Sequence, residues 1–241
     1  MNDKPTVPTL PFHFAVEFDE ADLPQELAAL VDGRILDPAV HGADDAGPGF
    51  VILRGMPAEK SPWIGLPRTA WVAEGLEETA RCRDRFPDLV WVPRTGGYRP
   101  QVIYEMGDRY PGEGFRVFVP DTAAIRGFNV SDGEQTTDAW LARATELGFV
   151  TVWLHGFDAA EKGNGLDLEL LERARRNYKG GLWLSGGATE PRHLATLRAE
   201  GGAQAAIVAT TVAATWSLEE LSAALGRELP LQPFKRSSAA V

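Results

Sequence analysis

The chain contains very little cysteine and no long hydrophobic run. Its 241 residues include one cysteine, Cys82, which excludes an intrachain disulfide framework and a zinc site built from cysteines. Cys82 lies in a charged, helix-like stretch, so we interpret it as a structural or incidental thiol. No apolar run approaches the roughly 20 residues that span a bilayer, and residues 1–6 do not resemble a signal peptide. We therefore expect a cytoplasmic protein.

Positive charge is also scarce. The chain has 24 Lys and Arg residues against 34 Asp and Glu residues, which gives a formal net charge of −10. Nonspecific binding to nucleic acid or to an anionic membrane needs a positive face, so this balance argues against both partners. A phosphorylated ligand would then be held by local basic residues or by backbone amides.

Metal-binding patterns are absent from the sequence as well. His13, His41 and His193 show no ligand spacing with one another or with acidic pairs. We therefore expect neither a metal nor another cofactor, and the sequence does not indicate an oligomeric state.

Strand-like and helix-like segments alternate at short intervals in the second half of the chain. Because each crossover returns the chain in the same direction, repeated β-α units predict a parallel sheet. Asp167 caps one predicted helix, and Ser217 with Glu220 makes a capping box for another. The predicted strands are residues 115–121, 149–154, 181–184 and 205–209, and the predicted helices are 137–147, 167–176, 191–199 and 217–225.

The first half of the chain is less regular. Its predicted strands are residues 12–18, 50–53, 69–73 and 89–93, with a strand or short helix at 102–106, helices at 24–31 and 75–86, and a loop at 37–49. This alternation leaves two α/β architectures, a closed (β/α)8 TIM barrel and an open doubly wound sheet. A length near 250 residues favours the barrel. No glycine-rich fingerprint follows the first strand to decide between the two.

No linker divides the chain. We predict a single TIM-barrel domain over residues 1–241, irregular in its N-terminal half. Its ends, at about residues 1–10 and 229–241, are expected to pack loosely, because proline and serine follow the last predicted helix.

Residues 181–191, with the sequence GLWLSGGATEP, combine a buried strand, two glycines and a helix start. An apolar run without alternation is typical of a strand covered on both faces. Gly186 and Gly187 allow close approach of the backbone to a ligand. Thr189 as N-cap then opens a helix whose free N–H groups face the same place. We interpret this segment as a phosphate-binding turn. The alternative is a strand-to-helix turn that needs glycine only for its backbone dihedrals.

Other polar residues follow predicted strands and would meet at the mouth of a barrel. His155 ends a strand, and with an ordinary pKa near ~6.5 it is a candidate proton shuttle, or alternatively it closes a turn. Glu74 and Arg94 are further candidates for the mouth. Five tryptophans are predicted to be mostly core residues, one or two of which can stack on a flat heterocycle: Trp63, Trp71, Trp91, Trp153 and Trp183.

Several segments match one family in order. In the second half, VPD at 119–121 is similar to the family's fifth strand, and LARATELGF at 141–149 is similar to the helix before its sixth strand. GNGLDLELL at 163–171 is similar to the loop and helix after that strand. LSGG at 184–187 is similar to its seventh-strand phosphate turn, and AIVA at 206–209 is similar to its eighth strand. WVPRTGGYR at 91–99 is similar to its Gly-Gly-x-Arg turn after the third strand. The chain thus resembles the histidine-biosynthesis barrels, the HisA/HisF group of phosphoribosyl isomerase and imidazole glycerol phosphate cyclase. The resemblance implies a TIM barrel that holds a bisphosphorylated substrate at two opposite phosphate sites.

The resemblance also implies roles for single residues. Glu17 and Asp121 match the two carboxylates that act across the barrel mouth, as general base and general acid of an Amadori-type isomerisation. Each is alternatively a cap or a salt-bridge partner, and Asp19 or Glu20 can take the place of Glu17. An arginine beside two glycines can bind phosphate bidentately, although arginine is also a frequent surface residue. Phosphate contacts are implied for Ser185, Gly186, Gly187 and Thr210 and, at the second turn, for Gly96, Gly97 and Arg99.

Four motifs depart from the family. The eighth-strand turn reads ATT at 209–211, YEM at 104–106 replaces a fourth-strand Gly-Thr, LHGFD at 154–158 replaces an Asp-rich sixth-strand motif, and the first strand offers Glu17 in place of Asp. We therefore predict a divergent relative that acts on a phosphorylated ribosyl or heterocyclic small molecule, by acid–base isomerisation or a related lyase or synthase step. Some relatives serve one-carbon cofactor pathways based on methanopterin or methanofuran. The alternatives are a non-catalytic phosphate-binding barrel and a true phosphoribosylformimino-aminoimidazole carboxamide ribotide isomerase.

Overall fold

The structure is a computed structural model, and it describes residues 12–17, 24–46, 49–98, 101–105, 116–120, 129–130 and 135–228. Its strands are β1 (His13–Glu17), β2 (Gly33–Leu36), β3 (Phe50–Arg54), β4 (Thr69–Glu74), β5 (Val90–Tyr98), β6 (Gln101–Glu105), β7 (Arg116–Pro120), β8 (Asn129–Val130), β9 (Thr151–Gly156), β10 (Gly181–Ser185) and β11 (Ala205–Ala209). Its helices are α1 (Gln25–Ala28), the 3-10 helix η1 (Ala43–Ala46), α2 (Leu76–Arg85), α3 (Thr137–Glu146), α4 (Phe157–Lys162), α5 (Leu168–Asn177), α6 (Pro191–Glu200), α7 (Thr210–Ala213) and α8 (Leu218–Leu225).

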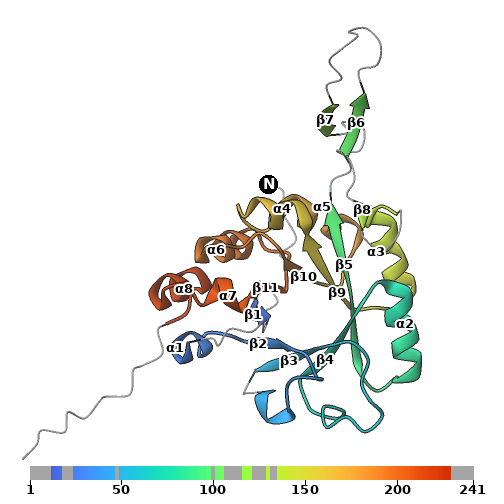
Figure 1. The fold of residues 1–241 in the computed structure, drawn as a ribbon, viewed down its shortest axis with the longest axis vertical. Helices are drawn as coiled ribbons and strands as arrows, with labels where there is room; N and C mark the ends of the chain where they lie inside the picture. The colour runs from blue at the N-terminus through green and yellow to red at the C-terminus, as the bar shows by residue number, and fades with distance from the viewer. Residues whose placement is uncertain are drawn as a thin grey trace, which may run out of the picture.

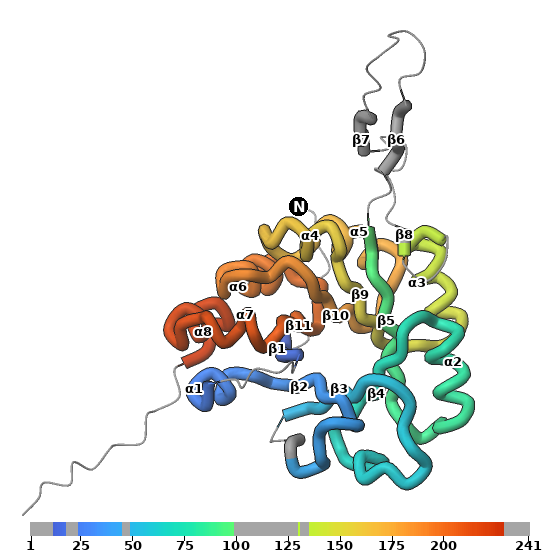
Figure 2. The backbone as a smooth tube through the Cα atoms, in the orientation of Figure 1, coloured from blue at the N-terminus to red at the C-terminus, as the bar shows by residue number. Residues whose placement is uncertain are grey.

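Eight parallel strands close into a barrel. They follow the order β4-β3-β2-β1-β11-β10-β9-β5, and pairing of β4 with β5 closes the ring. The two ends of the barrel sequence meet where β1 pairs with β11, which Figure 2 shows as a blue strand beside an orange-red one. Helices lie around the outside of this ring (Figure 1). The predicted (β/α)8 TIM barrel is thus confirmed, and the open sheet is excluded.

Two predicted strands exist but do not belong to the barrel. Among the described residues, β6 and β7 pair only with each other, in an antiparallel two-stranded sheet. The fifth barrel strand is β5, and the assignment of residues 115–121 to that place was wrong. A pattern of apolar residues predicts an extended segment, but it does not say which strand will pair with it. Asp121, the acid expected at the end of this strand, lies outside the described residues.

The second barrel strand was missed by the sequence pattern. β2 has only four residues, and it begins at Gly33 directly after a short turn. A side chain at Gly33 would collide with the Phe50 ring, whose nearest atom lies 2.3 Å from the position of a Cβ. Glycine here is therefore needed for the packing of β2 against β3, and it does not mark a loop.

The barrel strands separate two hydrophobic clusters. Residues that point inward form the smaller cluster: Ala15, Ile35, Ile52, Val72, Val92, Trp153, Trp183, Ala205 and Ile207. Residues that point outward, such as Phe14, Trp71 and Leu184, pack under the helices in the larger one. Because successive side chains of a strand alternate between faces, these clusters fix which strand-end residues point into the barrel.

Helix coverage differs between the two halves of the barrel. Between β3 and β4, residues 55–68 contain only turns, whereas long helices precede and follow β9, β10 and β11. The predicted caps at Asp167 and Ser217 are confirmed, since each side chain accepts a hydrogen bond from a backbone N–H of the helix that follows. The N-cap of α6 is Glu190 rather than Thr189, so that prediction was wrong by one residue.

Candidate active site

Polar side chains gather at the carboxyl-terminal ends of the barrel strands. On each strand they stand two residues beyond an inward-facing core residue, so they also point into the barrel. We call this set the mouth residues: Glu17 on β1, Arg54 on β3, Glu74 on β4, Arg94 on β5, His155 on β9 and Ser185 on β10. This face is where TIM barrels carry their active sites.

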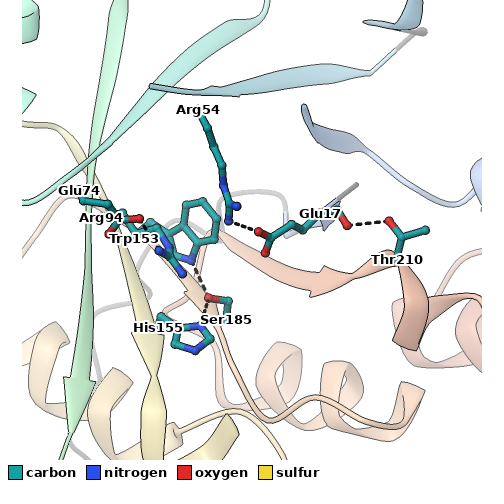
Figure 3. A network of polar contacts seen from close by, with 8 residues as sticks. All are labelled: Glu17, Arg54, Glu74, Arg94, Trp153, His155, Ser185 and Thr210. Atoms are coloured by element: carbon teal, nitrogen blue, oxygen red, sulfur yellow. Dashed lines mark hydrogen bonds and ion pairs between the residues drawn. The ribbon is translucent and has the colours of Figure 1, made fainter. Parts of the chain in front are cut away.

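Two ion pairs form the charged part of the mouth. Arg54 donates to the carboxylate of Glu17, and Arg94 donates to the carboxylate of Glu74. Both guanidinium groups lie near the indole ring of Trp153, with Cζ 5.8 Å from the ring centroid for Arg54 and 4.6 Å for Arg94. Figure 3 shows the indole flanked by these residues. Two cations therefore share one aromatic ring, each beside the carboxylate with which it pairs.

A neutral hydrogen-bonded group forms the other part of the mouth. The indole Nε1–H of Trp153 donates to Ser185 Oγ at 2.7 Å, and His155 Nδ1 lies 2.9 Å from the same oxygen. Ser185 is 4% exposed and Trp153 is fully buried. The ring of Phe157 packs edge-on against His155, with ring centroids 5.1 Å apart. These contacts hold the imidazole in one place.

Burial and the two arginines control the charge of His155. Desolvation is the largest cause, and Arg94 and Arg54 add to it, so the pKa of His155 falls from its ordinary 6.5 to about 4. The imidazole is therefore neutral at neutral pH. This pKa lies below the ordinary value expected from the sequence, because the sequence shows neither the burial of this histidine nor the nearby arginines. Burial and Arg94 also lower the pKa of Arg54.

The glycine turn after β10 is packed against other backbone. Gly186 and Gly187 have φ angles of +93° and +92°, in the left-handed region that favours glycine. A Cβ at Gly187 would lie 2.1 Å from the carbonyl oxygen of Gly165, and one at Gly186 would lie 2.6 Å from that of Gly156. Both glycines are thus required by the fold itself. Within the described part of the chain, the N–H of Gly187 meets no acceptor.

The helix that follows this turn already has partners at its first turn. Glu190 and His193 form a reciprocal capping box. The His193 ring nitrogen Nδ1 accepts from the N–H of Thr189 at 3.2 Å and from that of Glu190 at 3.4 Å. The hydroxyl of Thr189 donates to the Gly163 carbonyl. The sequence predicted free N–H groups at this helix start, and this prediction is wrong for the amides of Thr189 and Glu190.

Short helix α7 follows β11 and begins at Thr210. The Thr210 hydroxyl donates to the carbonyl oxygen of Glu17 at 2.7 Å, which joins the end of β11 to the end of β1 (Figure 3). Thr210 is fully buried. Its side chain therefore has a donor role inside the protein, and a phosphate beside it would be held by other donors.

The second predicted phosphate turn lies inside a strand. Gly96 and Gly97 are residues of β5, opposite His155 and Gly156 of β9. A Cβ at Gly96 would lie 2.0 Å from the Phe157 ring, so this glycine makes room for α4. These residues belong to the fifth barrel strand, not the third, and they do not face β10 across the barrel. Arg99 lies outside the described residues.

Sequence reasoning placed Glu17, Glu74, Arg94, His155 and Ser185 at the mouth but missed Arg54. A signal was present, because Arg54 follows the apolar run of β3 and precedes Gly55, as Glu74 follows β4 and precedes Gly75. Within the described ranges, no three His, Cys, Asp or Glu side chains come together as a metal site would need. Nor does that part of the chain hold a helix with the length and apolar character to cross a membrane.

Comparison with known proteins gives two related sequences, while no protein-family model matches the chain. One is the imidazole glycerol phosphate synthase subunit HisF of Metallosphaera sedula, 31% identical over 108 residues, or 45% of this chain and 40% of the relative. The other is the subunit HisF of a Nocardioides species, 32% identical over 139 residues, or 51% of this chain and 53% of the relative. The chain spans about half the length of these curated relatives. With the closed eight-stranded barrel, these matches support a divergent HisA/HisF-like TIM barrel.

Proposed function

We propose that this barrel binds a phosphorylated small molecule, ribosyl or heterocyclic, at the carboxyl-terminal face and acts on it by acid–base isomerisation or a related step. The observation that carries the proposal is the ring of six mouth residues beside the glycine turn of β10. Convergent polar groups at this end of a TIM barrel are the usual basis of catalysis in the fold.

Phosphate binding is supported mainly by the backbone. The N–H of Gly187 has no acceptor in the described part of the chain, and the turn is rigid because Gly186 and Gly187 are packed against neighbouring carbonyl groups. A fixed backbone donor at a strand-to-helix turn is a common element of phosphate sites. The net charge of −10 makes such local donors necessary. The two relatives are named for imidazole glycerol phosphate, which supports a ligand with a phosphate group.

Acid–base chemistry would centre on Glu17. Its carboxylate ends β1 inside the mouth and is held by Arg54, with 27% of the side chain exposed. In this proposal Glu17 takes a proton from the carbon beside the carbonyl or imine of the substrate. His155, in its neutral form, contacts a substrate oxygen. The altered strand-end motifs favour a divergent relative, and the finer form of the proposal places it in methanopterin or methanofuran biosynthesis.

The first experiment separates phosphate recognition from sugar recognition. Thermal unfolding is measured with ribose 5-phosphate and with ribose at matched concentration. The proposal expects a rise in the unfolding temperature with the phosphorylated sugar only. Equal behaviour of the two sugars up to millimolar concentration would remove the phosphate part of the proposal.

The second experiment tests the chemistry. The isomerase substrate of histidine biosynthesis and other aminoaldose phosphates are incubated with the wild type and with Glu17→Gln, which keeps the size of the side chain. We expect turnover of at least one of them by the wild type and a loss of at least about 100-fold in the variant, the scale of a missing general base. Binding without turnover of any of these substrates would favour the non-catalytic barrel. Rescue of a strain that lacks the isomerase would instead assign the true histidine-pathway activity.

A further inference from the structure

Trp153, Ser185 and His155 form a short chain of hydrogen bonds in the neutral part of the mouth. The indole Nε1 of Trp153 lies 2.7 Å from Ser185 Oγ, and His155 Nδ1 lies 2.9 Å from the same oxygen. In Figure 3 both dashed lines meet at the Ser185 hydroxyl. The direction of each bond follows from which groups can donate.

The indole fixes the first direction. Indole nitrogen is a donor only, so Ser185 must accept from Trp153. The Ser185 hydroxyl still has one proton to donate, and it is 4% exposed. Across the described residues, the only other hydrogen-bond partner of this hydroxyl is His155 Nδ1. If Nδ1 carried a proton, both nitrogen atoms would donate to Ser185 and the hydroxyl proton would have no acceptor. A buried donor without an acceptor is costly, so the hydroxyl donates to Nδ1.

The proton of the neutral ring must then be on Nε2. We infer that Ser185 is a positioning residue which fixes His155 as the Nε2–H tautomer, and that His155 presents this N–H to an oxygen of the ligand. Ser185 itself would not be a phosphate contact, because its donor is already used. The identity of the ligand as a phosphorylated molecule rests on the proposed function, but the assignment of the tautomer does not.

The surroundings of the ring support this state. His155 Nε2 meets no hydrogen-bond partner anywhere in the described part of the chain, so it is open to a ligand. The ring atom Cε1, next to Nε2, lies 3.1 Å from the position of a Cβ on Gly186, which puts this edge of the imidazole beside the glycine turn.

The groups that face the imidazole disfavour a second proton. They are Arg54 from β3, Arg94 from β5, Ser185 from β10 and the apolar ring of Phe157 from α4. Both charged groups are cations, and burial acts in the same direction, so the pKa of His155 is low. His155 thus acts as a fixed neutral donor, in place of a residue that alternates between charged and neutral forms.

The test is nuclear magnetic resonance of the full chain labelled with ¹⁵N histidine. The sequence has four histidines, and His155→Gln assigns the signal of interest. At neutral pH the two-bond ¹H–¹⁵N correlations of His155 are expected to show a single neutral tautomer with the proton on Nε2. An Nδ1–H pattern, an averaged pattern or a protonated ring in the wild type would overturn the inference.

Two serine variants show whether Ser185 is the cause. In Ser185→Ala we expect the pattern to shift toward a mixture of tautomers. Ser222→Ala is the control, because Ser222 is also 4% exposed and its removal costs a buried side-chain hydrogen bond, the one to the carbonyl of Arg227. The control is expected to leave His155 unchanged. An equal shift in both variants would overturn the positioning role. If Ser185→Ala does not fold, the wild-type pattern still decides the inference.

Inorganic phosphate provides a separate measurement. It is titrated into the labelled protein, with chloride at the same ionic strength as the reference, and the Nε2-bound proton of His155 is followed. A shift with phosphate alone is expected. If the tautomer is as inferred but phosphate does not shift the Nε2-bound proton signal, the phosphate part of the proposed function fails. The assigned tautomer of His155 and the positioning role of Ser185 then still stand.

Discussion

The two sides of the barrel mouth are built from different chemistry. The strands of the first half, β1, β3, β4 and β5, carry paired charges at the mouth, Glu17 with Arg54 and Glu74 with Arg94. The strands β9 and β10 of the second half end in neutral groups, His155 and Ser185, followed by the rigid glycine turn.

This difference separates a part of the mouth whose packing the fold depends on from a part that contributes little to stability. The charged pairs are partly exposed, at 41% for Arg54 and 66% for Glu74, so each is screened by water and stabilises little. The neutral side is buried and in close backbone contact, so it tolerates little change. The charged side acts on the neutral side through space, since its arginines help to keep His155 uncharged.

The largest effect is expected on the neutral side, from Gly187→Ala. The new Cβ would be 2.1 Å from the Gly165 carbonyl oxygen at a φ of +92°, so we expect a loss of about 3 kcal/mol or more in the free energy of unfolding. Denaturant unfolding measures the loss. Gly148→Ala is the control, because Gly148 has a φ of +76° and nothing lies within 4 Å of the added carbon. It should lose only about 1–2 kcal/mol. Equal losses would mean that the turn is not closely packed.

An intermediate effect is expected from pH. The native pKa of His155 is about 4, whereas an unfolded histidine has its ordinary value of 6.5. As the pH falls from about 6.5 to about 4, the unfolded state therefore takes up the proton first, and the native state is destabilised. His155→Gln removes this contribution. Between pH 6.5 and pH 4 the wild type should lose about 2 kcal/mol more unfolding free energy than the variant. This figure is reduced to allow for solvent screening.

Unfolding free energies of the wild type and His155→Gln measured from pH 4 to pH 8 would show this difference. Above about pH 6.5 the gap between the two proteins should stay constant, which serves as the internal reference. A gap that does not change across the whole range would contradict the low pKa.

The smallest effect is expected on the charged side. Arg54→Gln breaks the ion pair with Glu17, and because both side chains are partly exposed we expect a change of less than about 1 kcal/mol in unfolding free energy. A double-mutant cycle with Glu17→Gln isolates the pair. A coupling well above that value would make the pair a structural element, and the contrast between the two sides would then fail.

Much of the fold could be predicted because each element carries its own local signal. The strands and helices of the second half have apolar runs and capping residues, and Asp167 and Ser217 start helices as expected. β2 was missed because four residues are too few to show a period. β6 was left open between strand and helix, and β7 was given to the barrel, because a strand pattern does not name its partner.

The part of the candidate site that could be predicted is the part that follows from the alternation of side chains along a strand. Glu17, Glu74 and His155 follow buried strand residues in sequence, so their place at the mouth could be inferred. The partners of these residues could not. Arg54 and Glu17 are 37 residues apart, and His155 and Ser185 are 30 apart, and no local pattern reports a contact over such distances.

The sequence alone determined the type of fold, the turn after β10 and most of the polar residues of the mouth, because periodicity, capping and strand-end position are local properties. Only the tertiary structure decided how these residues act. Closing the barrel brought Arg54 and Arg94 to one indole ring and partly buried His155. It also put Gly186 and Gly187 against backbone carbonyl groups. Charge, protonation and packing depend on neighbours in space, and the closed ring of strands supplies those neighbours.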